Sequence, residues 1–190
     1  MEAFESFVAL AMEDEGLVVS EAIKFPVPRR TRKLAYEEVQ VHGYEVDLVG
    51  ARADRLVLAT VKSFLGSRGV AVEHVTVGPE SASHHRGYAL LNNPELRAAV
   101  LDGACQRFGY LPGQVEFRLY AGRFAAPTTG LHEQEIRQWC GSQNVGVGPI
   151  KVFNLTEVAE VAIKVAESKT YRDNAALTAI KVLRSAGRLT

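Results

Sequence analysis

The sequence predicts an α/β fold with a central mixed β-sheet flanked by helices, and three observations support this class. Two β-rich segments, 39–49 and 55–62, are joined by a short turn-forming stretch. Apolar residues recur at helical spacing before and after them, in 3–15 and 94–108. The chain has 190 residues, which is enough for one well-buried core and few for two, since domains typically hold ~100–150 residues. One domain is therefore expected.

The first predicted helix covers 3–15, where Phe4, Val8 and Met12 share one stripe. Gly16 ends it as a C-cap. Residues 17–27 alternate loosely and then meet two prolines, so we expect a short strand that leads into a loop.

The clearest local signal is a hairpin. Segment 39–49 is rich in β-branched and aromatic residues, 50–54 supplies turn chemistry, and 55–62 is again β-rich. Because the connection is short, the two strands are predicted to pair antiparallel.

The rest of the chain alternates between helical and extended patterns. Segment 63–88 is interpreted as mostly loop with one possible strand at 70–77, and the glycine-rich 141–148 as a flexible connection. Thr156 is expected to be the N-cap of the helix that follows it. The remaining predicted elements are a helix at 94–108 ended by Gly109, a strand at 115–120, a helix at 132–140, a strand at 150–155, and helices at 157–168 and 174–186.

Composition excludes several classes. Hydrophobic residues make up 47% and charged residues 23%, as in soluble globular proteins. No apolar run approaches the ~18 residues of a membrane span, and the acidic start of the chain lacks the basic region of an export signal. A cytoplasmic location without membrane association is therefore expected. Cys105 and Cys140 have no ligand partners at metal-binding spacing and are predicted to be free thiols.

The net charge is zero, but the charges are unevenly distributed. The first helix is acidic, and a compact basic cluster follows at Arg29, Arg30, Arg32 and Lys33. Such a cluster either contacts phosphate backbones or forms an ordinary solvated loop, and the sequence leaves both readings open. The pair His84–His85 with Arg86, in a polar loop, either contacts phosphate or assists proton transfer, or is an ordinary loop segment.

The hairpin also carries the residues with chemical potential. Strand alternation places Glu45 and Asp47 on one face of the first strand and Thr60 and Lys62 on one face of the second. A carboxylate can hold Mg²⁺, which polarises a phosphate and generates hydroxide from water. A neighbouring lysine can orient or deprotonate that water and stabilise the developing negative charge.

These residues carry a resemblance to a known family. The segments Tyr44-Glu45-Val46-Asp47-Leu48-Val49 and Leu56-Val57-Leu58-Ala59-Thr60-Val61-Lys62-Ser63 resemble the core motifs of the PD-(D/E)XK nuclease superfamily. Its small members also carry a glutamate in the first helix and a glycine that ends it, which Glu5 and Gly16 match. The match covers about the first third of the chain. The helix at 94–108 and the strand at 115–120 follow in a compatible order.

The resemblance implies a restriction-endonuclease-like domain over 1–190, with a motif core of about 1–120 and a C-terminal strand and helices over 150–187. Asp47 would be the central metal ligand and Lys62 the catalytic lysine. Glu5 and Glu45 would be auxiliary acids or metal ligands. Mg²⁺ or Mn²⁺ would be the cofactor, DNA the partner, and a homodimer the assembly that addresses two strands. A nucleotide cofactor is not expected, since 141–148 lacks the P-loop and G-x-G-x-x-G patterns.

One position departs from the family pattern. Thr60 stands where the family has its second metal-binding acid, and a neutral hydroxyl is a poor ligand for Mg²⁺. Glu45, Glu5 or Glu73 would have to compensate. The sequence therefore leaves three alternative functions open. They are a Mg²⁺-dependent DNA nuclease, a non-cleaving nuclease-fold module that binds nucleic acid or protein, and a scaffold that assembles through its C-terminal helices.

Overall fold

The chain forms a five-stranded sheet in the order β1-β2-β3-β4-β7, in a computed structural model that describes residues 2–30, 39–78, 83–168 and 173–189. The first three strands pair antiparallel, and β3, β4 and β7 run parallel. The predicted mixed sheet is confirmed. The strands are β1 (Val18–Arg30), β2 (Val39–Arg52), β3 (Arg55–Lys62), β4 (Val115–Ala121) and β7 (Lys151–Asn154).

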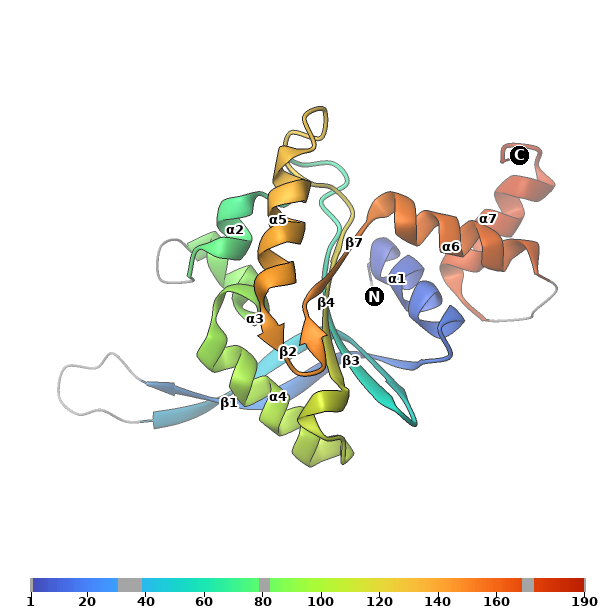
Figure 1. The fold of residues 1–190 in the computed structure, drawn as a ribbon. Coiled ribbons are helices and arrows are strands. Elements are labelled where there is room, and N and C mark those ends of the chain that lie inside the picture. The colour runs from blue at the N-terminus through green and yellow to red at the C-terminus, as the bar shows by residue number, and fades with distance from the viewer. Residues whose placement is uncertain (1, 31–38, 79–82, 169–172, 190) are drawn as a thin grey trace.

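Helices cover both faces of this sheet (Figure 1). The first face carries α1 (Ala3–Asp14), α6 (Leu155–Glu167) and α7 (Ala175–Ser185). The second carries α2 (Val72–Thr76), the 3₁₀ helix η1 (Ser83–Tyr88), α3 (Ala89–Asn92), α4 (Pro94–Phe108) and α5 (Leu131–Ser142). β1 and β2 extend beyond the other strands as a two-stranded arm (Figure 1).

Each face has its own apolar core. Leu58 and Phe117 pack with α4 and α5 on the second face, while Leu48 and Tyr120 pack with α1 on the first. All four are at most 1% exposed, and burying a side chain of this size stabilises the fold by ~1.5–3 kcal/mol. Because β4 is buried on both faces, its position is firmly specified by apolar contact.

The C-terminal helices close the first face over α1. Asn154 and Asn174 accept from the backbone N–H groups of Glu157 and Leu177 and so cap α6 and α7. Leu10 of α1 then packs with buried residues of both helices, among them Ala162 and Ile180. The buried stripes of both helices are thus covered by α1, whereas Ile163, Val182 and Leu183 remain exposed.

Four local predictions were wrong. The strand expected at 17–27 does not give way to a loop at the prolines, because β1 runs through Pro26 and Pro28 and stays paired with β2 as far as Arg30. Segment 63–88 contains α2 and η1 rather than a strand at 70–77, although Val70 makes a single bridge to Phe124. Segment 141–148 is not a plain connection, because β5 (Asn144–Val145) and β6 (Gly148–Pro149) pair within it. The N-cap of α6 is Asn154, not Thr156, since its amide oxygen reaches Glu157 N–H at 2.9 Å.

Candidate active site

The site begins where β1 and β2 change the face that they present. Val46 packs in the core beneath α4, but Leu48, two residues on, packs beneath α1. Regular alternation would place both on one face. Ala22 lies between the Glu21–Leu48 and Ile23–Val46 pairs, opposite Asp47, and has φ +51°. Because β1 and β2 both change faces at the same point, the pairing between them stays in register. Asp47 lies at this bend.

Asp47 has two carboxylate oxygens in different situations. Its Oδ2 accepts hydrogen bonds from Thr60 Oγ1 at 3.0 Å and from the Val61 backbone N–H at 2.7 Å. Regular β2–β3 pairing ends just before, at Leu48–Ala59, so the carboxylate takes over a backbone donor that the ladder no longer satisfies. Oδ1 has no partner among the described residues. One oxygen thus supports the strand end while the other is open to a ligand.

Lys62 stands beside this carboxylate at the end of β3. Its Nζ lies 3.6 Å from Asp47 Oδ2, and the two side chains are 18% and 23% exposed. The backbone of Lys62 is held by β4, since Gly122 N–H donates to its carbonyl at 2.8 Å. A Cβ on Gly122 would approach the Ser63 carbonyl oxygen to 2.2 Å, so only glycine fits there. The structure therefore brings Asp47 and Lys62 together, as the hairpin pattern predicted.

A pocket of about 320 Å³ opens at Asp47, and we call it the acidic pocket. Carboxylates from three elements meet there, with only Ala22 as an uncharged lining residue. Two of these acids, Glu2 and Glu21, were missed by the sequence analysis, because neither lies in the hairpin motif. The lining residues are Glu2, Glu5, Glu21, Ala22, Glu45 and Asp47.

The predicted auxiliary acids do line this pocket, but each already has a contact. Glu5 Oε2 accepts from the Glu2 backbone N–H at 2.9 Å and thereby stabilises the start of α1. Glu45 lies 3.6 Å from Lys24 Nζ across the β1–β2 pair. Glu2 accepts from Ser63 Oγ at 3.0 Å, which ties α1 to the residue after Lys62. Of the residues that the structure describes, Lys24 and Lys62 are the lysines paired with acids of the pocket, and each faces a carboxylate.

Thr60 does not supply a second acid. It is 4% exposed and donates to Asp47. Glu73 lies on α2 with Arg68 3.4 Å away and does not line the acidic pocket, so it does not compensate. The candidates for a second acid are therefore Glu45, Glu5 and the two newly found glutamates.

The carboxylate oxygens of the acidic pocket are suitable donors for a divalent cation, but they do not surround a single point. Among the described residues, no three His, Cys, Asp or Glu side chains converge closely enough to hold a metal ion. Sharing a pocket is a weaker condition than converging on one point. Mg²⁺, however, keeps several waters and is commonly held by one or two carboxylates together with substrate phosphates. Within the described part of the chain, the pocket thus offers individual carboxylates, Asp47 with its open Oδ1 among them, but no converging set.

Behind Lys62 lies an aromatic layer that the sequence analysis took for loop. The Tyr88 ring centroid is 5.7 Å from Lys62 Nζ, and His74, for which no partner was predicted, stacks on Tyr88 at 5.1 Å. His85 is buried at 5% exposure rather than displayed in a polar loop. The nearby Tyr44 accepts from Leu90 N–H. Burial raises the pKa of Tyr44 to about 12, against the effect of that hydrogen bond, so its phenol stays protonated near neutral pH.

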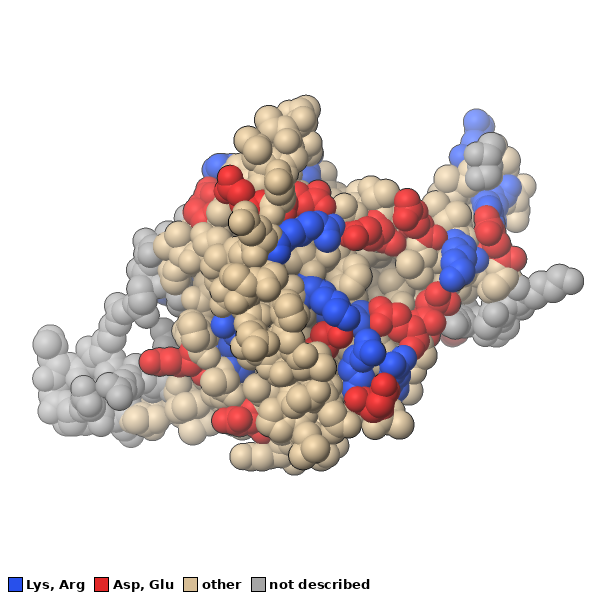
Figure 2. Space-filling view, in the orientation of Figure 1, with Lys and Arg blue, Asp and Glu red and all other residues tan. Residues whose placement is uncertain are grey.

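The predicted basic cluster lies at the arm. Arg29 and Arg30 end β1, paired with Gln40 and Val39, whereas Arg32 and Lys33 lie outside the described residues. On the face drawn in Figure 2, lysines and arginines are interspersed with acids rather than gathered into one basic area. Both interpretations of this basic cluster, a phosphate-contacting surface and a solvated loop, therefore stay open.

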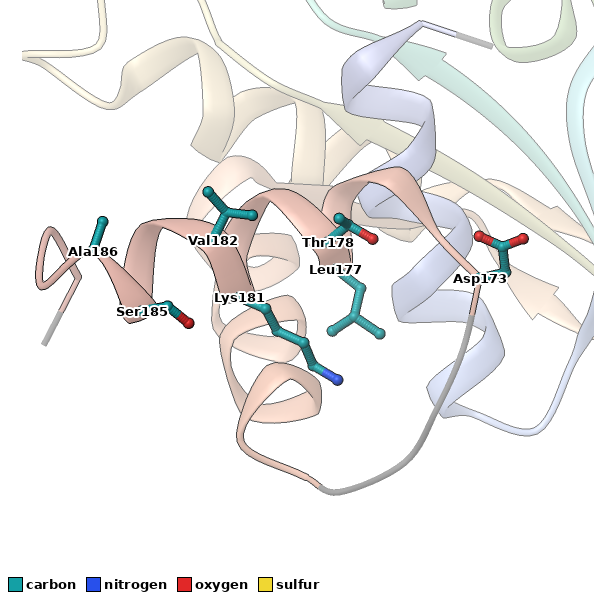
Figure 3. A pocket seen from close by; sticks show the side chains of 7 residues that line it. All are labelled: Asp173, Leu177, Thr178, Lys181, Val182, Ser185 and Ala186. Atoms are coloured by element: carbon teal, nitrogen blue, oxygen red, sulfur yellow. The ribbon is translucent and has the colours of Figure 1, made fainter.

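A second, larger hollow of about 530 Å³ follows α7 and the residues next to it (Figure 3). Leu177, Lys181 and Val182 line it from successive turns of this one helix. It contains none of the predicted site residues. A single helix also brings no polar groups together from different elements, so the hollow does not compete with the acidic pocket as an active site.

The two cysteines are free, as predicted, with Cys140 buried and Cys105 half-buried. Burial raises the pKa of Cys140 to about 12, although the Arg97 guanidinium lowers it. Burial raises the pKa of the Cys105 thiol as well. Neither thiol is therefore an activated nucleophile.

Comparison with known proteins adds little. No protein-family model matches the chain, and no curated protein does. The crystal structure of AF1548, a protein of unknown function, aligns over 97% of this chain and 78% of its own, with 14% identity and a TM-score of 0.38. No helix in the described ranges is long and apolar enough to cross a membrane.

Proposed function

We propose that the chain is a restriction-endonuclease-like protein that hydrolyses DNA phosphodiester bonds with Mg²⁺ or Mn²⁺ at the acidic pocket. The observation that carries the proposal is the Asp47–Lys62 pair, with Nζ 3.6 Å from Oδ2, in which Asp47 also lines a pocket rich in carboxylates. The element order supports it too: α1, three antiparallel strands, α4, and a strand parallel to β3. This order is compatible with the family that the motifs resemble.

In this proposal the acidic residues and the lysine have separate roles. Asp47, through its open oxygen, and Glu45 or Glu5 would hold the cation. A bound Mg²⁺ would polarise the phosphate and lower the pKa of its water. Lys62 would orient the attacking water and stabilise the negative charge that develops on the phosphate. Because carboxylates alone would repel a phosphate, DNA should approach this pocket only when a divalent cation is present.

A direct test is cleavage of supercoiled plasmid and branched DNA with Mg²⁺, Mn²⁺ or EDTA. Asp47→Asn keeps an oxygen acceptor for Thr60 and Val61 but removes the charge, and Lys62→Met removes the ammonium group. Each should reduce cleavage by about 10²–10⁴-fold. Matched controls are Asp54→Asn and Lys164→Met, whose partners Arg52 and Asp14 lie outside the pocket. Equal rates in the site and control variants would refute the proposal.

A second candidate is a non-cleaving module that binds nucleic acid. It is favoured by Thr60, which stands at the position where the family has its second acid. Its hydroxyl donates a hydrogen bond to Asp47 Oδ2. Under this reading, DNA binding persists without cleavage in any metal. Replacing Arg29, Arg30, Arg32 and Lys33 by glutamine should then flatten the dependence of log K on log salt by ~0.9 per lost phosphate contact. Cleavage by the wild type would exclude this candidate.

A further inference from the structure

Besides its ion pair with Asp47, Lys62 contacts a buried aromatic ring. Tyr88 is 3% exposed, and its ring centroid lies 5.7 Å from Lys62 Nζ. This is within the ≈ 6 Å range in which an ammonium group is attracted to an aromatic face. The Lys62 ammonium group thus has two attractive neighbours, the Asp47 carboxylate and the face of Tyr88.

The ring itself is held firmly in place. His74 stacks against it at an interplanar angle of 26°, and His74 Nδ1 accepts from the Ala71 N–H at 3.2 Å. Asn92 Nδ2 donates to the carbonyl oxygens of His74 and His85, at 2.9 and 3.0 Å. The layer that supports Lys62 is therefore built from backbone-anchored side chains of α2, η1 and α3.

The Tyr88 hydroxyl has a different status from its ring. It is buried and has no hydrogen-bond partner among the described residues. Burial raises the pKa of Tyr88, so the ring stays neutral and does not act as an acid or a base near pH 7. A buried phenol whose hydroxyl bonds to no described residue contributes through the face of its ring.

We propose that Tyr88 is a positioning residue for Lys62, whose ammonium group it holds beside Asp47 and the acidic pocket. The inference rests on the proposed function for its catalytic consequence, but the contact itself belongs to the free protein. A lysine stem has several rotatable bonds, and one ion pair leaves its end free to swing. A second attraction, to the Tyr88 ring, restricts the ammonium group further and keeps it where it can reach a phosphate at Asp47.

The test compares Tyr88→Phe with Tyr88→Leu. The phenylalanine variant keeps the aromatic face and removes a hydroxyl that bonds to no described group, so it should retain wild-type kcat. The leucine variant keeps an apolar side chain but loses the π-face, and its kcat should fall roughly tenfold, as for the loss of a desolvated cation–π contact, with KM nearly unchanged. Tyr88→Met is the substitute if the leucine variant does not fold.

A second readout does not depend on activity. In protein carrying ¹³C at lysine Cε, the ring current of Tyr88 should shift the Lys62 resonance upfield, with Lys62→Arg as the assignment control. The shift should persist in Tyr88→Phe and vanish in Tyr88→Leu. An unchanged resonance in Tyr88→Leu, or an unchanged kcat, overturns the inference. A wild type that never cleaves DNA refutes the proposed function, and a Lys62 resonance without the upfield shift refutes the contact.

Discussion

Two groups of paired acidic and basic side chains lie on the sheet, one around Arg118 and one at Asp47 and Lys62, and their surroundings differ. At the centre of β4, Arg118 is 1% exposed and pairs with Glu116 at 2.5 Å and with Glu15 at 2.6 Å. Tyr120 accepts from it as well, and Phe153 lies under its guanidinium group. At the end of β3, Asp47 and Lys62 are 3.6 Å apart, each about a fifth exposed, with one carboxylate oxygen open.

The difference separates a charge cluster that maintains the fold from one suited to a ligand. Around Glu116, Arg55 and Lys151 add further cations, so the buried acid is surrounded by opposite charge. In the acidic pocket carboxylates outnumber the two lysines near it, Lys24 and Lys62. A saturated buried cluster has little to offer an incoming ion, whereas an excess of acid favours binding of a cation.

The largest effect should come from breaking the saturated cluster. Arg118→Leu removes the central cation and leaves Glu116 buried at 2% exposure with fewer partners. Loss of one member of a buried ion pair costs about 3–5 kcal/mol in the free energy of unfolding. Urea denaturation measures it, with Arg184→Leu as the control. That arginine pairs with the more exposed Glu167, so its loss should cost about 0–1 kcal/mol. Equal losses of unfolding free energy in the two variants would mean that the buried ion pair is no more important for stability than the exposed one.

A smaller effect is expected from adding an acid to the open cluster. In Thr60→Glu, a second carboxylate replaces a hydroxyl that lies 3.0 Å from Asp47 Oδ2. Without divalent cations, the like charges should lower the free energy of unfolding by roughly 1–3 kcal/mol. Mg²⁺ should restore part of this, because a ligand that binds only the folded state stabilises it. Thermal unfolding of Thr60→Glu and of neutral Thr60→Gln, with EDTA and with Mg²⁺, measures the effect. A Mg²⁺ response equal in both variants would contradict the site.

The pH dependence of stability should reveal the saturated cluster. Burial pushes the pKa of Glu116 upward, but the hydrogen bond from Lys151 and the charge of Arg118 outweigh it and lower the pKa. A carboxyl whose folded pKa is depressed contributes stability above its unfolded pKa of ~4.3 and loses it as pH falls through the folded value. Unfolding should therefore become easier below about pH 4.3. Glu116→Gln should show a flatter dependence in that range, and an unaltered slope would rule out this contribution.

The sequence was sufficient for the hairpin and for the meeting of Asp47 with Lys62, because the short turn fixes the register of β2 on β3. It did not predict the break in strand alternation between Val46 and Leu48. It was insufficient for the layer behind Lys62. Tyr88 and His74 lie in a glycine- and histidine-rich stretch whose short helices leave no periodic signal. The acids Glu2 and Glu21 were missed for a related reason. They reach the pocket through the packing of α1 and the bend at Ala22, which are tertiary features.

The bend at Ala22 gives the finest test of the comparison. Ala22 has φ +51° where β1 passes Asp47, a conformation that is costly for a residue with a Cβ and accessible to glycine. If the bend exists to place Asp47 at the pocket, Ala22→Gly should relieve strain and raise the free energy of unfolding by up to about 1 kcal/mol. Ala22→Val should lower it, because a β-branched side chain tolerates positive φ poorly. Both follow from urea denaturation, with the Asp47-dependent cleavage rate measured in parallel. A glycine variant that is less stable than the wild type would mean that the alanine methyl packs in the pocket wall, and that the bend is maintained by side-chain contact rather than imposed on the backbone.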